Sequence, residues 1–127
     1  MRVNTLRIPV RDLVGSQDFY REALGREPAF GNAEEEYVGF FLDNVTVLLE
    51  AQEPGGFEAG RYLGFSLEVP DVRAFYDDAV ARDIPFAHPP EIQPWGGIMT
   101  HVIDPDGNVF SVIQMEETQD PGKDVHA

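Results

Sequence analysis

The sequence predicts an α+β fold built from two tandem βαβββ modules. An internal repeat, the same order of hydrophobic periodicities in each half, and an ordinary globular composition support this prediction. Residues 10–30 align with residues 69–86 once a three-residue gap is allowed, and the aligned pairs include Asp12 with Asp71. Two copies are too few for a solenoid, so two similar modules packed together fit the pattern better.

The first module begins with a strand, because residues 6–10 alternate between apolar and polar side chains. Ser16 is a candidate N-cap for the helix that follows, and Gly25 supplies its C-terminal stop. The module closes with a short strand near Phe30 and a hairpin formed by residues 37–42 and 45–51.

The second module repeats this order. Residues 63–69 indicate a strand, and Asp71 caps a helix with apolar residues on one face. A short strand near residues 85–87 precedes a hairpin of residues 98–103 and 109–114, which are joined by the turn 104–108. Asp104, Asp106 and Asn108 imitate the start of an EF-hand loop, but their glycine comes too early, so a hairpin turn explains them better.

We therefore expect one domain spanning residues 1–127. Its parts are a first module (3–51), a linker (52–61) that is rich in glycine, a second module (62–115) and an acidic tail (116–127).

The charge of the chain excludes several classes of partner. It has 127 residues with 9 Lys and Arg against 23 Asp and Glu, a net charge of −14. Such a surface repels nucleic acid and anionic membranes. No signal peptide or membrane-spanning stretch is visible, so we expect a cytoplasmic protein. The acidity is explained by solvation or habitat, or alternatively by steering of a cationic small molecule.

Several motifs resemble those of a known superfamily. They are residues 10–13 (VRDL) with 19–21 (FYR), the copy at Asp71 and 75–76, the loop 94–97 (PWGG) and the turn 104–109 (DPDGNV). Together they resemble the vicinal oxygen chelate superfamily, which includes glyoxalase I, extradiol dioxygenases and the metal-free bleomycin-resistance proteins. The resemblance covers residues 3–115 and implies two cupped mixed sheets with helices on the outside and a ligand in the cup.

The resemblance also implies where a divalent metal would be bound. The positions that match the usual ligands hold Thr5 on the first strand, Val47 or Leu48 on the fourth, Gly64 on the fifth and Ser111 on the eighth. A catalytic metal ion needs about three fixed nitrogen or oxygen donors, which these residues do not supply. We therefore expect no metal or other cofactor. An improvised site from Glu50, Glu68 and His101 stays open, although nothing in their spacing demands it.

Strand parity and the resemblance nominate residues for a ligand site. They are Arg7, Leu49, Glu68, Trp95, His101 and Ser111. Trp95 is either a plug over the core or a stacking wall for a flat ligand. His101 is either a half-buried structural residue or a polar group facing the cup. His88 is expected in a surface loop, and His126 in the tail.

These observations predict a metal-independent small-molecule binding protein that resembles the bleomycin-resistance group and sequesters an aromatic or cationic compound. The resemblance further implies a homodimer. One alternative is a lyase, isomerase or dioxygenase on the same fold, with a rearranged or absent metal site and with His101 or Glu68 as general base. A third possibility is a relative whose ligand site has decayed into a packing core.

Overall fold

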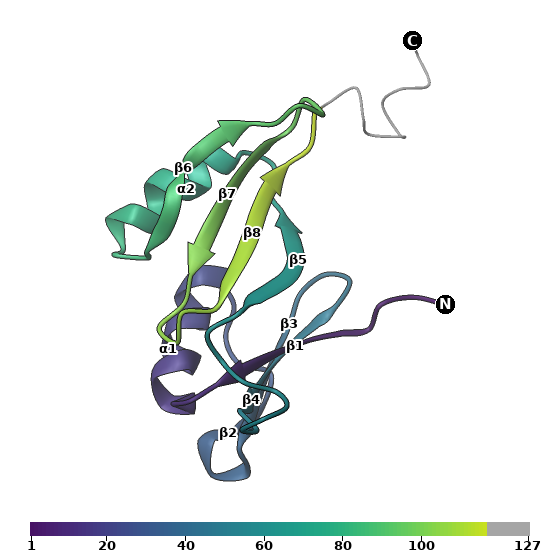
Figure 1. Cartoon of the computed structure of the whole chain (residues 1–127), viewed down its shortest axis with the longest axis vertical. Helices are drawn as coiled ribbons and strands as arrows, with labels where there is room; N and C mark the ends of the chain where they lie inside the picture. Colours follow the sequence, from purple (N-terminus) through teal and green to yellow (C-terminus); the bar gives the residue numbers. More distant parts are fainter. Residues whose placement is uncertain (117–127) are drawn as a thin grey trace. The chain divides into compact units, whose positions relative to one another are not determined.

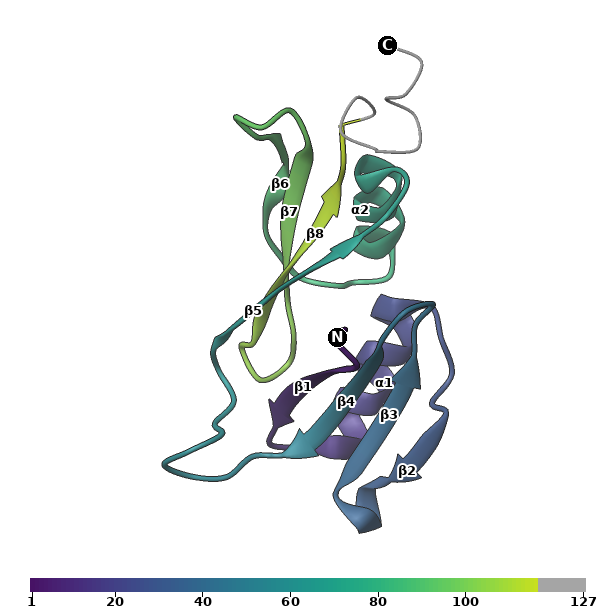
Figure 2. The same cartoon turned by 90° about the vertical axis from the view of Figure 1, so that its right-hand side faces the viewer.

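The two halves of the chain fold with the same order of strands and helices, as the internal repeat predicts. A computed structural model describes residues 1–116, and Figures 1 and 2 show its elements. One compact unit contains Met1–Leu63 with Asp104–Asn108, and the second contains Gly64–Ile103 with the described residues from Val109 onwards. The tail expected after residue 116 lies outside the described residues. No helix within residues 1–116 has the length and apolar character needed to cross a membrane.

The first module forms a four-stranded mixed sheet with one long helix. Its strands lie in the order β1-β4-β3-β2, with β1 parallel to β4 and the other pairs antiparallel. The elements are β1 (Thr5–Val10), α1 (Leu13–Leu24), β2 (Phe30–Asn32), the 3-10 helix η1 (Ala33–Glu35), β3 (Tyr37–Phe41) and β4 (Thr46–Ala51).

The second module repeats this topology, because its strands lie in the order β5-β8-β7-β6. The elements are β5 (Tyr62–Glu68), α2 (Val72–Ala81), β6 (Phe86–Ile92), β7 (Ile98–Ile103) and β8 (Val109–Gln114). The α+β prediction of two tandem βαβββ modules is confirmed.

The start of α1 differs from the sequence prediction. Asp12 is the N-cap, since its carboxylate accepts a hydrogen bond from the Val14 amide at 3.1 Å. Ser16 lies inside the first turn, where its own amide donates to the Asp12 carbonyl. The predicted C-terminal stop is confirmed, because Gly25 adopts a left-handed conformation with φ 65°. Asp71 caps α2 as predicted.

Each helix covers one face of the sheet in its own module. In the first, α1 contacts β3 and β4 and buries the face that carries Ile8, Val38 and Leu49. In the second, α2 contacts β6, β7 and β8 and buries the face of Val102 and Val112. Because side chains alternate along a strand, the residues between these positions lie on the opposite, open face of each sheet.

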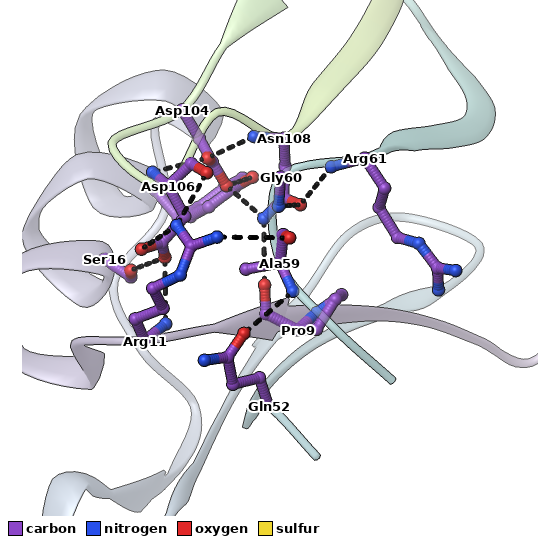
Figure 3. Close-up of polar contacts among 11 residues, drawn as sticks. Pro9, Arg11, Ser16, Gln52, Ala59, Gly60, Arg61, Asp104, Asp106 and Asn108 are labelled. Carbon is purple, nitrogen blue, oxygen red and sulfur yellow. Dashed lines mark hydrogen bonds and ion pairs between the residues drawn. The ribbon is translucent and has the colours of Figure 1, made fainter. Parts of the chain in front are cut away.

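The turn 104–108 belongs to the first unit and is fixed by a buried polar network (Figure 3). Asn108 is fully buried; its Oδ1 accepts from the amides of Gly60 and Arg61, and its Nδ2 donates to the Pro9 carbonyl and to Asp104. The Asp104 amide donates to the Asn108 carbonyl across the turn. The hairpin-turn interpretation of this motif is confirmed.

A second buried contact joins the turn to α1. The Tyr20 hydroxyl donates to Asp104 Oδ2 at 2.7 Å, and both side chains are buried. Burial raises the pKa of Tyr20 far above its usual value, and the neighbouring Asp104 carboxylate raises it further. Tyr20 therefore stays a neutral donor throughout the physiological pH range.

Candidate functional site

The open face of the first sheet carries an ion pair set against an aromatic ring. Arg7 on β1 donates from Nε to Glu50 Oε1, and from Nη2 to Glu50 Oε2 at 3.2 Å. The Arg7 guanidinium carbon lies 4.8 Å from the centroid of the Phe57 ring, within the range of a cation–π contact. The hydrogen bond and charge of Glu50 raise the pKa of Arg7. This bidentate pair keeps the guanidinium in a fixed orientation although its side chain is 57% exposed.

Three aromatic rings cluster on the same open face. Phe30 on β2 pairs with Gly39 on β3, and its ring occupies the space where a side chain at Gly39 would lie. Its centroid is 5.6 Å from that of Phe41 and 6.2 Å from that of Tyr37. Phe30 is 39% exposed and Phe41 is 58% exposed. The sequence analysis did not predict this cluster. Tyr37 and Phe41 are separated by an even number of residues, which is the spacing of side chains on one face of a strand.

Leu49 does not share this face with Arg7, contrary to the parity expected from the sequence. Arg7 is registered with Leu48, whereas Leu49 is registered with Ile8 and is fully buried beneath α1. Of the two alignments left open for the fourth strand, Leu48 is the one on the open face, and Val47 is buried with Leu49. Contact of Leu49 with a ligand would require the core to open, so Leu48 replaces it as a candidate.

The open face of the second sheet carries the other polar candidates. Ser111 on β8 donates its hydroxyl to the Phe65 carbonyl at 3.2 Å, so Ser66 on β5 donates in turn to the Ser111 hydroxyl. His101 on β7 is registered with Ser111. Glu68 lies at the exposed end of β5, an even number of residues from Ser66 and therefore on the same face.

His88 lies on β6 and not in a loop, contrary to the sequence expectation. Its Nε2 is 2.7 Å from His101 Nδ1, and its Nδ1 is 2.7 Å from the Pro89 carbonyl oxygen and 3.2 Å from Glu91 Oε1. Burial lowers the pKa of His101, and a charge on His88 would lower it further, against a smaller opposing effect of Glu91. The structure thus joins His101 to a second imidazole that the sequence did not connect with it.

Trp95 lies on the turn between β6 and β7, where the Gln93 amide donates to the Gly97 carbonyl. Its indole covers Gly97, because a side chain at that glycine would overlap the ring. The residue is 37% exposed. The indole is therefore not a buried plug, and its use as a stacking wall stays a prediction.

The residues at the usual metal positions do not fit a divalent ion. Thr5 donates its hydroxyl to Asn4 at 2.6 Å, Ser111 is engaged with Ser66 and Phe65, and Gly64 and Leu48 offer no side-chain donor. Glu50 is held by Arg7. Among residues 1–116, no three His, Asp or Glu side chains group in a way that could hold a metal ion.

The fold and these residues can be compared with known proteins. Residues 2–112 match the model of the glyoxalase/bleomycin resistance protein/dioxygenase superfamily, so the chain belongs to this superfamily. A bleomycin resistance protein of Klebsiella pneumoniae is 31% identical over 120 residues, which are 88% of this chain and 91% of that protein.

Two solved structures extend the comparison. A superfamily member from Sphaerobacter thermophilus is 31% identical with a TM-score of 0.77, covering 91% of this chain and 98% of its own. The bleomycin resistance determinant encoded on the transposon Tn5 is 25% identical with a TM-score of 0.70, covering 91% and 99%.

Proposed function

We propose that this protein binds an aromatic or cationic small molecule on the open face of its first sheet, without a metal ion. The main observation in support of this proposal is a pair of exposed rings, Phe30 and Phe41. They lie on the sheet face that also presents the Arg7–Glu50 ion pair. Its similarity to proteins named for bleomycin resistance supports a role in sequestering such a compound.

The chemistry of the first open face supports an aromatic ligand. Partly exposed rings, with Leu48 beside them, form an apolar surface that a flat molecule can cover. The Arg7 guanidinium, which lies over the Phe57 ring, adds a planar cation to the same sheet. A few oriented polar groups within an apolar surface are typical of small-molecule sites.

A cationic ligand is supported by charge. The net charge of −14 attracts cations over long range, and Glu50 brings a carboxylate to the open face of the first sheet. Metal independence is supported by the donor set described above, in which Thr5 and Ser111 supply only neutral hydroxyls. A homodimer remains part of the proposal on the family resemblance, and a cytoplasmic location remains part of it as a prediction from the sequence.

Isothermal titration calorimetry of chelator-treated protein tests the proposal. The probes are N-methylacridinium, a permanent aromatic cation, and acridone, a neutral molecule of similar shape. We expect both to bind, and the affinity of the cation alone to fall as salt is raised. Phe41→Ala should weaken both probes about tenfold, equal to the roughly 1.4 kcal/mol that a stacked ring contributes.

The matched control is Val14→Ala, because Val14 is an apolar residue of α1 that is 62% exposed and lies outside the proposed face. This variant should keep wild-type affinity. Binding that appears only after a divalent ion is added would contradict metal independence, and equal losses in both variants would contradict the proposed face.

A further inference from the structure

We propose that a row of residues across the first sheet binds a flat, fused-ring molecule that carries a hydrogen-bond acceptor at one end, and that Arg7 recognises this acceptor. The row is part of the proposed site, so the inference rests on the proposed function. It adds the functional group that the ligand carries, the direction in which the ligand lies on the sheet, and the residue that distinguishes it from an unsubstituted hydrocarbon.

The register of the strands defines the row. It takes one residue from each strand, paired one after another across the sheet: Arg7 on β1, Leu48 on β4, Gly39 on β3 and Phe30 on β2. Paired residues of neighbouring strands lie on the same face, so all four positions belong to the open face.

Gly39 and Phe30 set the length of the row. A side chain at Gly39 would overlap the tip of the Phe30 ring, so this ring lies over β3. Leu48, which is half-buried, is the one residue of the row between Gly39 and Arg7. From Gly39 to Arg7 the row crosses two strand spacings, about 10 Å, which is about the length of three fused aromatic rings.

Arg7 is an oriented hydrogen-bond donor at the other end of the row. Its Nε and Nη2 donate to the two Glu50 oxygens, and its Nη1 has no acceptor among residues 1–116. The Phe57 ring lies on one side of the guanidinium, with its centroid 4.8 Å from the guanidinium carbon. The Arg7 side chain is nevertheless 57% exposed, so the guanidinium is accessible to a ligand.

The groups that hold Arg7 are themselves fixed. The Phe57 amide donates to the Glu53 carbonyl at 3.0 Å, and the Glu53 amide donates to the Phe57 carbonyl at 2.8 Å. A donor that is oriented before the ligand arrives loses little conformational freedom on binding, so more of its hydrogen-bond energy contributes to affinity. Glu50 is therefore a positioning residue for Arg7.

The chemistry of Arg7 Nη1 specifies the group that the ligand carries. A guanidinium only donates hydrogen bonds, so the end of the ligand beside Arg7 must accept one, as a carbonyl oxygen does. A hydrogen bond from a charged donor is about twice as strong as one between neutral groups. The Glu50 carboxylate balances the charge of Arg7, so the pair selects an acceptor and not a net negative charge. A cationic group elsewhere on the ligand is compatible with it.

The test compares 9-fluorenone with fluorene, two flat tricyclic molecules of nearly the same shape, of which only fluorenone carries a carbonyl oxygen. Equilibrium dialysis against the full chain, below the solubility of each probe, measures both affinities. Arg7→Met keeps an unbranched side chain but removes the donor. It should lower the affinity for fluorenone about tenfold and that for fluorene less than about twofold. Glu50→Gln should lower the fluorenone-to-fluorene affinity ratio by a smaller factor.

Two further variants test the other end of the row. Gly39→Ala displaces the Phe30 ring and Phe30→Ala removes it, so each should weaken both probes about threefold or more and keep their affinity ratio. The matched control is Arg26→Met, because Arg26 pairs with Asp43 at 3.3 Å and lies outside the strands. This variant should keep both wild-type affinities.

The outcomes separate this inference from the proposed function. Equal losses of fluorenone and fluorene in Arg7→Met would overturn the inference and leave the proposed function intact. Binding of N-methylacridinium and acridone without binding of either tricyclic probe would do the same. If Phe30→Ala converted a dimer into a monomer and probe binding fell as the protein concentration rose, a second copy of the chain would cover the row and the inference would be wrong. Binding of none of the four compounds would overturn both.

Discussion

Replacing Asn108 by alanine is expected to lower the free energy of unfolding by about 4 kcal/mol. The side chain is fully buried and satisfies two backbone amides, the Pro9 carbonyl and the Asp104 carboxylate. Each buried polar group left without a partner costs about 1–3 kcal/mol, and rearrangement of the turn recovers part of the sum. Urea unfolding followed by circular dichroism measures the change.

The internal repeat offers a matched control for this experiment. Asn44 occupies the equivalent turn of the first module and is exposed. Asn44→Ala should change the unfolding free energy by less than about 0.5 kcal/mol, as surface substitutions usually do. A loss below about 1 kcal/mol in Asn108→Ala would mean that the turn 104–108 is not held by this amide.

Alanine at position 49 is expected to cost about 3 kcal/mol, whereas alanine at the adjacent position 48 costs less than about 1 kcal/mol. Leu49 is fully buried beneath α1, so truncation leaves a cavity in the core. Leu48 lies on the open face in register with Arg7. Thermal or urea unfolding of the two variants measures the difference.

The same pair of variants separates stability from binding. Leu48→Ala should weaken N-methylacridinium severalfold at nearly unchanged stability, because its side chain borders the aromatic cluster. Leu49→Ala should retain affinity under conditions in which it is fully folded. If Leu48→Ala were the more destabilising variant, the faces of β4 would be assigned the wrong way round.

The sequence predicted the fold well because the repeat and the periodicities agree. The β7–β8 hairpin has the predicted bounds, and Gly25 and Asp71 act as the predicted caps. The start of α1 could have been predicted from the repeat itself, which aligns Asp12 with the N-cap Asp71. Ser16 was favoured only because serine is a common cap and follows a glycine.

The location of His88 was harder to predict. Two prolines follow it, and proline cannot donate to a sheet ladder, which argues for a loop. The structure accommodates them because β6 is the edge strand, with register shifts on both sides of His88. Edge strands and bulges are the places where a sheet tolerates proline. The two prolines favour a loop, whereas the position of β6 at the edge of the sheet permits a strand. The sequence therefore did not predict the contact between His88 and His101.

The candidate site was predicted in part. Arg7, Glu68, His101 and Ser111 lie on the open faces of their sheets, and Leu49 does not. Leu49 was assigned to the wrong face because the alignment of β4 was uncertain by one residue. A shift of one position moves a side chain to the other face of a sheet. The aromatic cluster was missed because its rings come from β2 and β3, which the resemblance did not nominate.

Chemical-shift mapping of N-methylacridinium on chelator-treated protein tests the central claim most directly. The account predicts that the amide signals perturbed by the probe belong to open-face residues, including Arg7, Leu48 and Phe41, and that adding a divalent ion changes none of them. Perturbations confined to α1 and α2, or a response that requires the metal ion, would contradict it.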